Sequence, residues 1–302
     1  MKSRRRELFN HIAELLPNTH LCTSLINYAY FFWKHRYLPS KQNLKSINDY
    51  FFLVKNSPSS AKYGYFTDKE NVKTFVSNIC GEEYIIPTLG VFDDIRALKQ
   101  FSYSKKYIVK PTHMSGEVII KREGSLSSQE ISLAQKWLKH DYSRISREYV
   151  YHSLEPKIII EPLLTYKGHI PFDYKFFTIN GRCEFVQVDI GRFSSHKRDL
   201  YDRDFNKLDL KFIYSNSPIT LNKPDNYGEM LSIVEKLASF FPFVRVDLYI
   251  TDDGIKFGEL TFVPEGGLGR FEPTAFEEKL LWKLNRNSAL PSSHEERLEV
   301  FS

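Results

Sequence analysis

Apolar and polar residues alternate with a period of two along residues 244–262, VRVDLYITDDGIKFGELTF. Before the Asp-Asp-Gly turn, this alternation puts valine, leucine and isoleucine on one face and Arg245, Asp247 and Tyr249 on the other. After the turn, the same rule puts four residues on a shared face: Ile255, Phe257, Glu259 and Thr261. The pattern therefore predicts two strands joined as a β-hairpin.

The length of the turn decides which side chains meet across the two strands. A three-residue loop, residues 252–254, pairs Thr251 with Ile255 and sets Asp247 directly opposite Glu259, whereas a two-residue loop separates the acids onto opposite faces. Two carboxylates this close repel each other unless a cation lies between them, and magnesium is a common solution. A solvated hairpin face with scattered charges is the other interpretation of this segment alone.

Helical patterns dominate the first part of the chain, and strand patterns dominate the rest. Amphipathic helices are predicted over residues 127–139 and 227–240. Thr67, with Glu70 three residues later, predicts a capping box and a helix that ends at Cys80-Gly81. Further strands are predicted over residues 107–110, 118–121, 157–164 and 172–189, the last with a turn at Asn180-Gly181. This order of elements indicates an α+β protein.

The composition narrows the class of ligand. The 302 residues carry a net charge of +5, and 42% of them are hydrophobic and 15% aromatic, which suffices for a folded core. This mild basic charge favours an anionic small ligand over duplex nucleic acid, which needs a concentrated basic face. The three cysteines lie far apart in no zinc or disulfide spacing, which is typical of a reducing, cytoplasmic compartment.

The longest apolar run, residues 21–33, is too short to span a bilayer. The basic start of the chain is followed by polar residues, among them Glu7 and Glu14, so it lacks the apolar core of a signal peptide. Two interpretations of the run are open. We favour a buried helix over peripheral membrane contact made together with the basic run Arg4–Arg6.

Several segments in the middle of the chain carry candidate chemistry. Lys110 ends a strand just before the loop Thr-His-Met-Ser-Gly, whose amides suit phosphate binding, although a plain hairpin is the alternative. An apolar strand ends at Glu161, which is either an edge residue or part of a hinge that reads adenine through its backbone. Asp173 and Lys175 share one face of the next strand. Residues 191–202 are predicted to form a basic loop that contains Arg192, His196, Lys197 and Arg198. This loop either takes part in function or is merely a solvated surface loop.

Eight segments in order, over about residues 35–285, resemble the ATP-grasp superfamily and in particular its branch related to the teichuronopeptide biosynthesis protein of bacterial surface polymers. They are TDKENVKTFV, GEEYIIPTLGVFDD, YIVKPTHMSG, IIIEPLL, FDYKFFTINGR, RFSSHKRDLYD, PFVRVDLY and FGELTFVPEGG. The resemblance implies an α+β ATP-grasp fold, with the nucleotide held between two β-rich subdomains and a helical N-terminal extension. We accordingly expect a helical region at residues 1–67, a central subdomain at 68–164, a C-terminal subdomain at 165–284 and a tail at 285–302.

The resemblance also implies which residues bind ATP. Lys69 and Lys110 correspond to the two lysines that contact its phosphates, and residues 161–164 correspond to the adenine hinge. Asp173 matches an acid that contacts the ribose or the phosphates. The phosphate loop departs from richer family patterns in having a single glycine, followed by the acid Glu117. The expected nucleotide-binding residues are Lys69, Lys110, Ser115, Gly116, Glu161, Leu163, Leu164 and Asp173.

Asp247 and Glu259 match the two magnesium-binding acids of the superfamily, so we expect an odd-numbered turn after Thr251 that sets them face to face. Thr261, the third expected metal ligand, stands where many members have asparagine. Its hydroxyl is a weaker ligand, which implies either one magnesium ion or a second held mostly by phosphate and water. Arg245 matches an arginine that faces the reacting phosphoryl or acyl group. The expected catalytic residues are Arg245, Arg198 and Lys175.

By this resemblance, the protein is expected to be an ATP- and magnesium-dependent carboxylate–amine ligase that acts through an acyl phosphate. Its partners would be a carboxylate sugar unit of a capsule, O-antigen or similar polymer and an amino acid, but no nucleic acid. We expect it in the cytoplasm, with contact to membrane-bound polysaccharide machinery left open. Two alternatives remain: an ATP-dependent phosphotransferase on the same fold, and a non-catalytic nucleotide-binding accessory protein of polysaccharide assembly. The loop Gly266-Gly267 with Arg270 is either a site for the acceptor carboxylate or a flexible surface loop.

Overall fold

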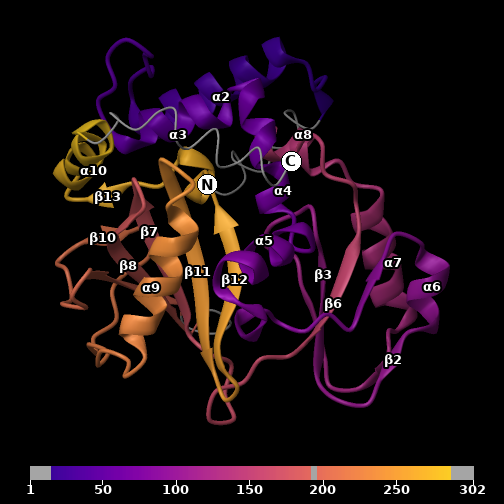
Figure 1. Ribbon diagram of the computed structural model, residues 1–302. Helices are drawn as coiled ribbons and strands as arrows, with labels where there is room; N and C mark the ends of the chain where they lie inside the picture. The colour runs from indigo at the N-terminus through magenta and orange to yellow at the C-terminus, as the bar shows by residue number, and fades with distance from the viewer. Residues whose placement is uncertain (1–14, 192–195, 287–302) are drawn as a thin grey trace. The chain divides into compact units, whose positions relative to one another are not determined.

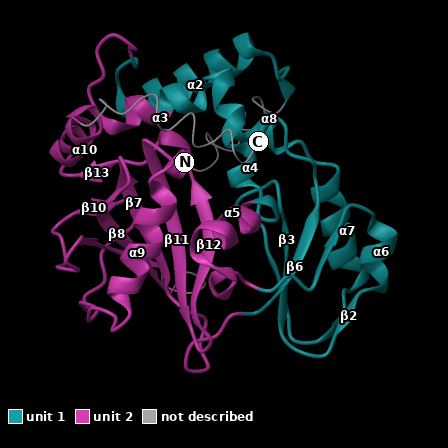
Figure 2. Cartoon of the chain, viewed as in Figure 1, with its two compact units in different colours: residues 1–39, 52–71, 87–163 teal, residues 40–51, 72–86, 164–302 magenta. Residues whose placement is uncertain are grey.

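Two antiparallel sheets organise the chain, one in each of two units that the computed structural model separates (Figure 2). The structure describes residues 15–191 and 196–286. Unit 1 comprises residues 1–39, 52–71 and 87–163, and unit 2 comprises residues 40–51, 72–86 and 164–302. The predicted division at residues 67, 164 and 284 stays a prediction.

The sheet of unit 1 has four strands in the order β1-β6-β3-β4. The isoleucines of β6 are completely buried, because this strand is paired on both sides. Helices α6 and α7 lie together beside this sheet (Figure 1). The elements are β1 (Gly90–Phe92), α6 (Ile95–Gln100), β2 (Ser102–Tyr103), β3 (Tyr107–Pro111), β4 (Ile119–Lys121), β5 (Gly124–Ser125), α7 (Ser128–Leu138) and β6 (Ile158–Pro162).

The helix starts show which capping signals the chain uses. The predicted helix over residues 127–139 is confirmed as α7, and Ser127 and Glu130 form its capping box. The predicted capping box at Thr67 is wrong. The carboxylate of Asp68 instead accepts hydrogen bonds from the amides of Glu70 and Asn71, both at 2.9 Å, and the next helix follows as α5 (Asn71–Cys80). Asp is as good an N-cap as Thr, and here it stands one residue closer to the helix.

The N-terminal part of the described chain is helical. Its elements are α2 (His20–His35), α3 (Ile47–Lys55), η1 (Pro58–Tyr63) and α4 (Gly64–Thr67), and unit 1 also contains α8 (Tyr142–Ser146) and η3 (Tyr149–Tyr151). The favoured interpretation of residues 21–33 as a buried helix is wrong for one side of α2, since Leu21 and Leu25 are exposed. Its other side is held by Asn27, whose side-chain amide donates to Asn56 Oδ1 at 3.1 Å and to the carbonyl of Arg147 at 3.0 Å.

The sheet of unit 2 has five strands in the order β12-β11-β7-β8-β9. Helix α9 packs against β7, β8 and β11 (Figure 1), and its Tyr227 ring stacks near Phe176. Asn180 and Gly181 form the predicted turn, both with positive φ. The elements are η2 (Glu82–Tyr84), β7 (Asp173–Ile179), β8 (Arg182–Ile190), β9 (Lys197–Asp202), β10 (Lys211–Phe212), α9 (Tyr227–Ala238), β11 (Phe243–Thr251), β12 (Gly254–Thr261), η4 (Pro264–Gly267), β13 (Phe271–Glu272) and α10 (Ala275–Arg286).

A β-bulge changes the register of the hairpin formed by β11 and β12. Thr251 pairs with Gly254, so the turn has two residues and the predicted odd-numbered turn is wrong. Leu248 pairs with Phe257, but Asp247 pairs with Glu259, which leaves Gly258 as the extra residue. The bulge shifts the alternation by one residue, so Phe257 faces the core while Glu259 faces Asp247. The predicted opposition of the two acids is therefore confirmed, whereas the predicted shared face of Phe257 and Glu259 is wrong.

Gly258 leaves no room for a larger residue. A Cβ atom placed there would lie 2.8 Å from Tyr249 Cε2 and 3.1 Å from the carbonyl oxygen of Asp247. We expect Gly258→Ala to lower the free energy of unfolding by about 1–3 kcal/mol, because the bulge must open to admit the methyl group. Urea unfolding measures the change. Gly228→Ala is the matched control, since Gly228 lies in α9 with open space around it, and that variant should be no less stable than the unmodified chain. Equal behaviour of the two variants would contradict a structural role for the bulge.

Candidate functional site

Antiparallel pairing lines up polar residues from distant parts of the sequence across one face of the unit 2 sheet. Each paired residue shares a face with its partner, so the pairs extend into rows across neighbouring strands. One row contains Glu259, Asp247, Lys175 and Gln187. The next contains Tyr249, Asp173, Asp189 and Arg198. The fold thus brings the expected metal and catalytic residues of unit 2 onto one surface.

The acid pair is bridged by an arginine. Arg245 Nε lies 2.7 Å from Asp247 Oδ1, and its Nη2 lies 2.7 Å from both Asp247 Oδ2 and Glu259 Oε1. Thr261 Oγ1 donates to Glu259 Oε1 at 3.5 Å. The side chain of Asp247 is buried, whereas that of Glu259 is 33% exposed. An ion or ligand can therefore reach the acid pair from the side on which Glu259 is exposed.

Lys175 supplies a second cation to the same cluster. Its Nζ lies 2.6 Å from Asp173 Oδ2 and also contacts Asp247 Oδ2. Burial by itself lowers the pKa of Lys175, but the carboxylates of Asp173 and Asp247 outweigh it and raise the pKa. Burial raises the pKa of Asp247 to about 7, against the opposing influence of Arg245 and Lys175. Three carboxylates thus surround two cations, which leaves the cluster acidic and receptive to a further cation when all five groups are charged.

Arg198 is buried in β9 rather than placed in a solvated loop. Its Nε and Nη2 bind the two oxygens of Asp189 at 2.7 and 3.2 Å, and its Nη1 lies 3.0 Å from Glu265 Oε1. Burial raises the pKa of Asp189, but the bonds from Arg198 outweigh this and lower it. The guanidinium also lies 4.8 Å from the centre of the Tyr214 ring. The solvated-loop interpretation is therefore wrong for Arg198, while Arg192 lies outside the described residues.

Three partners in this network were not among the residues predicted from the sequence: Gln187, Asp189 and Glu265. Gln187 donates to both oxygens of Asp189 at 3.1–3.2 Å, so it orients the carboxylate that holds Arg198. The signal was the alternation Val-Gln-Val-Asp in residues 186–189, which puts both polar residues on one face of β8. Glu265 gave no such signal, because it lies outside the strands, in η4, where its φ is 53°. Residues there follow no alternation of polar and apolar positions.

Unit 1 carries the expected nucleotide lysines. Lys110 Nζ lies 2.5 Å from Glu161 Oε2, and both side chains lie on the face of the sheet opposite the one that carries Val109. The amide of Leu163 donates to the carbonyl of Lys106 at 3.1 Å, so this part of the expected hinge is fixed within the unit. Leu164, the last residue of the expected hinge, begins the following segment of unit 2.

Lys69 contacts the backbone of the expected phosphate loop. Its amide donates to the carbonyl of Thr112 at 3.3 Å, and its Nζ contacts the carbonyl of Met114. Ser115 and Gly116 are exposed at the end of this loop. Gly116 has a φ of 87°, and nothing lies within 4 Å of the position that a Cβ would occupy. A ligand can therefore approach the backbone closely at this glycine.

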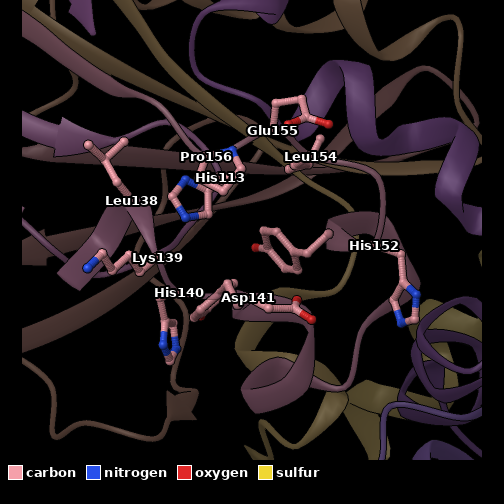
Figure 3. Close-up of a pocket in the computed structure, with 11 residues that line it drawn as sticks. His113, Leu138, Lys139, His140, Asp141, His152, Leu154, Glu155 and Pro156 are labelled. Carbon is pink, nitrogen blue, oxygen red and sulfur yellow. The ribbon is translucent and has the colours of Figure 1, made fainter. Parts of the chain in front are cut away.

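His113, in the same loop, faces a cavity of about 270 Å³ (Figure 3). Burial lowers the pKa of its imidazole, so the ring is neutral at pH 7. The other side chains that line the cavity include His140, His152, Asp141 and Glu155. The lining thus combines imidazoles and carboxylates with Lys139, so it favours neither an anion nor a cation.

Residues 52–282 match the family described as TupA-like ATPgrasp. The chain belongs to this family. Among solved structures, this ATP-grasp protein is similar to D-alanine–D-alanine ligase from Bacillus anthracis, with 14% identity and a TM-score of 0.42 over 78% of this chain and 71% of that one. It is also similar to the ATP-grasp ligase PsnB complexed with minimal precursor, with 12% identity and a TM-score of 0.37 over 69% of this chain. The match spans 54% of the PsnB chain, about half its length. No curated protein matches the chain.

The acid pair of this ATP-grasp protein fits a magnesium ion by its chemistry. Within residues 15–191 and 196–286, no cluster of three or more His, Cys, Asp or Glu side chains is arranged to hold a metal. Asp247 and Glu259 supply two carboxylates from facing positions, and magnesium usually takes one or two carboxylates together with phosphate oxygens and waters. Arg245 now bridges these oxygens, so a bound ion would displace or share that contact.

The exposure of Glu259 makes it the sharper test of this assignment. We expect saturating MgATP to raise the melting temperature of the unmodified protein by several degrees, and Glu259→Gln to lose most of that rise. The amide keeps the shape of the carboxylate but lacks the charge that holds magnesium. Asp253→Asn, an exposed acid in the turn of the same hairpin, is the matched control and should keep the full rise. An undiminished rise in Glu259→Gln would contradict the metal assignment.

Proposed function

We propose that the protein is an ATP- and magnesium-dependent carboxylate–amine ligase that acts through an acyl phosphate. A carboxylate oxygen of the acceptor attacks the γ-phosphorus of ATP, which forms the acyl phosphate and releases ADP. The amine then attacks the acyl carbon, and inorganic phosphate leaves as the amine loses a proton. The observation that carries the proposal is the cluster of Asp173, Lys175, Arg245, Asp247 and Glu259, in an ATP-grasp chain.

The roles of the acidic cluster follow from its charges. Asp247 and Glu259 are proposed to hold magnesium, which would supply positive charge to the phosphates of ATP and ADP. Arg245, which bridges the same two acids, is proposed to face the reacting phosphoryl or acyl oxygens. Lys175 stays between Asp173 and Asp247 and offsets part of the negative charge of these two carboxylates. Thr261 positions Glu259 through its hydroxyl, which favours one protein-held ion.

The nucleotide is proposed to use groups that are already ordered, most of them in unit 1, with Leu164 and Asp173 belonging to unit 2. The backbone amides of Ser115 and Gly116 donate hydrogen bonds to phosphate oxygens, and Lys69 supports this loop through its contact with the carbonyl of Met114. Lys110 pairs with Glu161 in the resting protein and transfers part of its bonding to a phosphate when ATP binds. The carbonyl or amide groups near Leu163 and Leu164 contact the adenine. Asp173 contacts the ribose or a phosphate.

Arg198 is proposed to stabilise the charge that develops on the transferred phosphoryl group. Asp189 and Gln187 fix its guanidinium, which removes most of the entropy loss that a flexible arginine would suffer. Glu265 holds the remaining Nη1 at 3.0 Å, and this contact with the partly exposed acid is the one that a substrate can replace.

The family supports a role in bacterial surface polysaccharide. The acceptor is proposed to be a carboxylate sugar unit of a capsule, O-antigen or teichuronopeptide, and the donor an amino acid. The reaction is proposed to take place in the cytoplasm, beside the membrane-bound machinery of polymer assembly. The two ATP-grasp subdomains are proposed to comprise residues 68–164 and 165–284, and a helical region is proposed to precede them.

Release of ADP separates this ligase from its alternatives. With a uronic acid as carboxylate and hydroxylamine as a general amine, we expect ADP and a hydroxamate in equal amounts, because hydroxylamine traps an acyl phosphate. Asp247→Asn should lower the rate on the order of 10²–10⁴-fold, and Asp253→Asn should not change it. ADP with a stable phosphorylated sugar and no hydroxamate would instead establish a phosphotransferase. Binding of MgATP without any ADP release across a panel of uronic acids would favour the accessory protein.

A further inference from the structure

Helix α2 presents several large apolar side chains outward, although Ile26 and Phe31 are buried on its other side. Leu21 is 68% exposed, Leu25 61%, Phe32 48% and Trp33 49%. Leu21, Leu25 and Phe32 follow one another at spacings of four and seven residues, which places them on one side of the helix. Leu38, just after the helix, is 60% exposed and extends the apolar surface.

Polar contacts fix the opposite side of α2 within unit 1. Thr23 and Asn27 are buried there, and Asn27 donates to both Asn56 and the carbonyl of Arg147. Arg147 in turn donates to the carbonyls of Leu16 and Pro17, both at 2.9 Å. Turning the apolar side inward would break these buried hydrogen bonds, so the outward apolar surface is a stable feature of the fold.

The charged residues in the sequence around α2 have a single sign. Between Glu14 and Asp49 the sequence contains no acidic residue. The same stretch contains four residues with a permanent positive charge, namely Lys34, Arg36, Lys41 and Lys45. Lys34, in the last turn of α2, and Arg36, at its C-cap, are exposed next to Phe32 and Trp33. Exposed apolar side chains next to such cations match an anionic lipid surface, in which apolar groups enter the acyl boundary and cations meet the headgroups.

We propose that α2 docks in the plane of an anionic phospholipid bilayer through Leu21, Leu25, Phe32 and Trp33. No described helix is long and apolar enough to cross a membrane, and α2 has 16 residues, so the contact is interfacial. A second copy fits the surface less well, because a symmetric dimer through α2 would bring two sets of like charges together. The inference does not depend on the proposed ligase activity.

Binding to vesicles tests the docking surface directly. The full chain is sedimented with vesicles of phosphatidylcholine alone, and with vesicles in which about a third of the lipid is phosphatidylglycerol. We expect binding to the anionic vesicles that weakens as salt is raised, since salt screens the headgroup charge. Leu25→Ser with Phe32→Ser should lower the partition coefficient by more than about tenfold, because both variants remove large apolar side chains that would leave water on binding. Ile219→Ser, which removes an equally exposed apolar residue elsewhere, should bind as the unmodified chain does.

Tryptophan fluorescence locates the contact. Anionic vesicles should shift the emission to shorter wavelength, and Trp33→Phe should abolish the shift. Trp282→Phe is the matched control, because Trp282 is 56% exposed on α10 and should not enter the lipid. The rise in melting temperature with MgATP should be the same in all of these variants, which separates failure of docking from failure of the nucleotide site.

Three results would overturn the proposal. The first is no sedimentation with either kind of vesicle. The second is a dimer in solution that Leu25→Ser dissociates, since the surface would then bind a second copy. The third is strong protection of Trp33 from acrylamide quenching in the lipid-free monomer, since another segment of the same chain would then cover α2.

Discussion

Neutralisation of the buried Asp247 carboxylate is the constraint on which the polar face of unit 2 depends. A charge removed from water is strongly unfavourable unless it is paired and hydrogen-bonded. Arg245 and Lys175 meet this need from β11 and β7, and each of them also binds a second acid. The result is a connected set of charges in which a change at one carboxylate alters the partners of the others. Such a cluster suits a site where a divalent ion and a polyphosphate arrive together, since both charges can be exchanged within it.

Backbone geometry makes the cluster possible. A regular hairpin with the observed two-residue turn would have put Glu259 on the core side of the sheet, away from Asp247. The extra residue at Gly258 restores the opposition, and its lack of a side chain lets the two strands stay close. A similar dependence holds in unit 1, where the positive φ of Gly116 exposes the backbone of the loop that Lys69 supports.

Much of this arrangement could be predicted from the sequence because it is local or periodic. The alternation around Asp247 and the helical pattern of residues 127–139 each depend on residues a few positions apart. The bulge could not be predicted from the alternation. A three-residue turn, and a two-residue turn followed by a one-residue bulge, both place Asp247 opposite Glu259, so the sequence pattern does not distinguish them. The outward face of α2 was the less favoured of two interpretations for a different reason. The buried Asn27 on its inner side binds Asn56 and Arg147, and such distant partners leave no periodic signal.

The most direct measurement is a structure of the protein with magnesium and a non-hydrolysable ATP analogue. We expect an ion about 2.0–2.1 Å from carboxylate oxygens of both Asp247 and Glu259, together with phosphate oxygens. We also expect Arg245 to have lost at least one of its contacts to these acids. An ion bound to the phosphates with neither acid as a ligand, and Arg245 still bridging both acids, would contradict the proposed role of the acid pair.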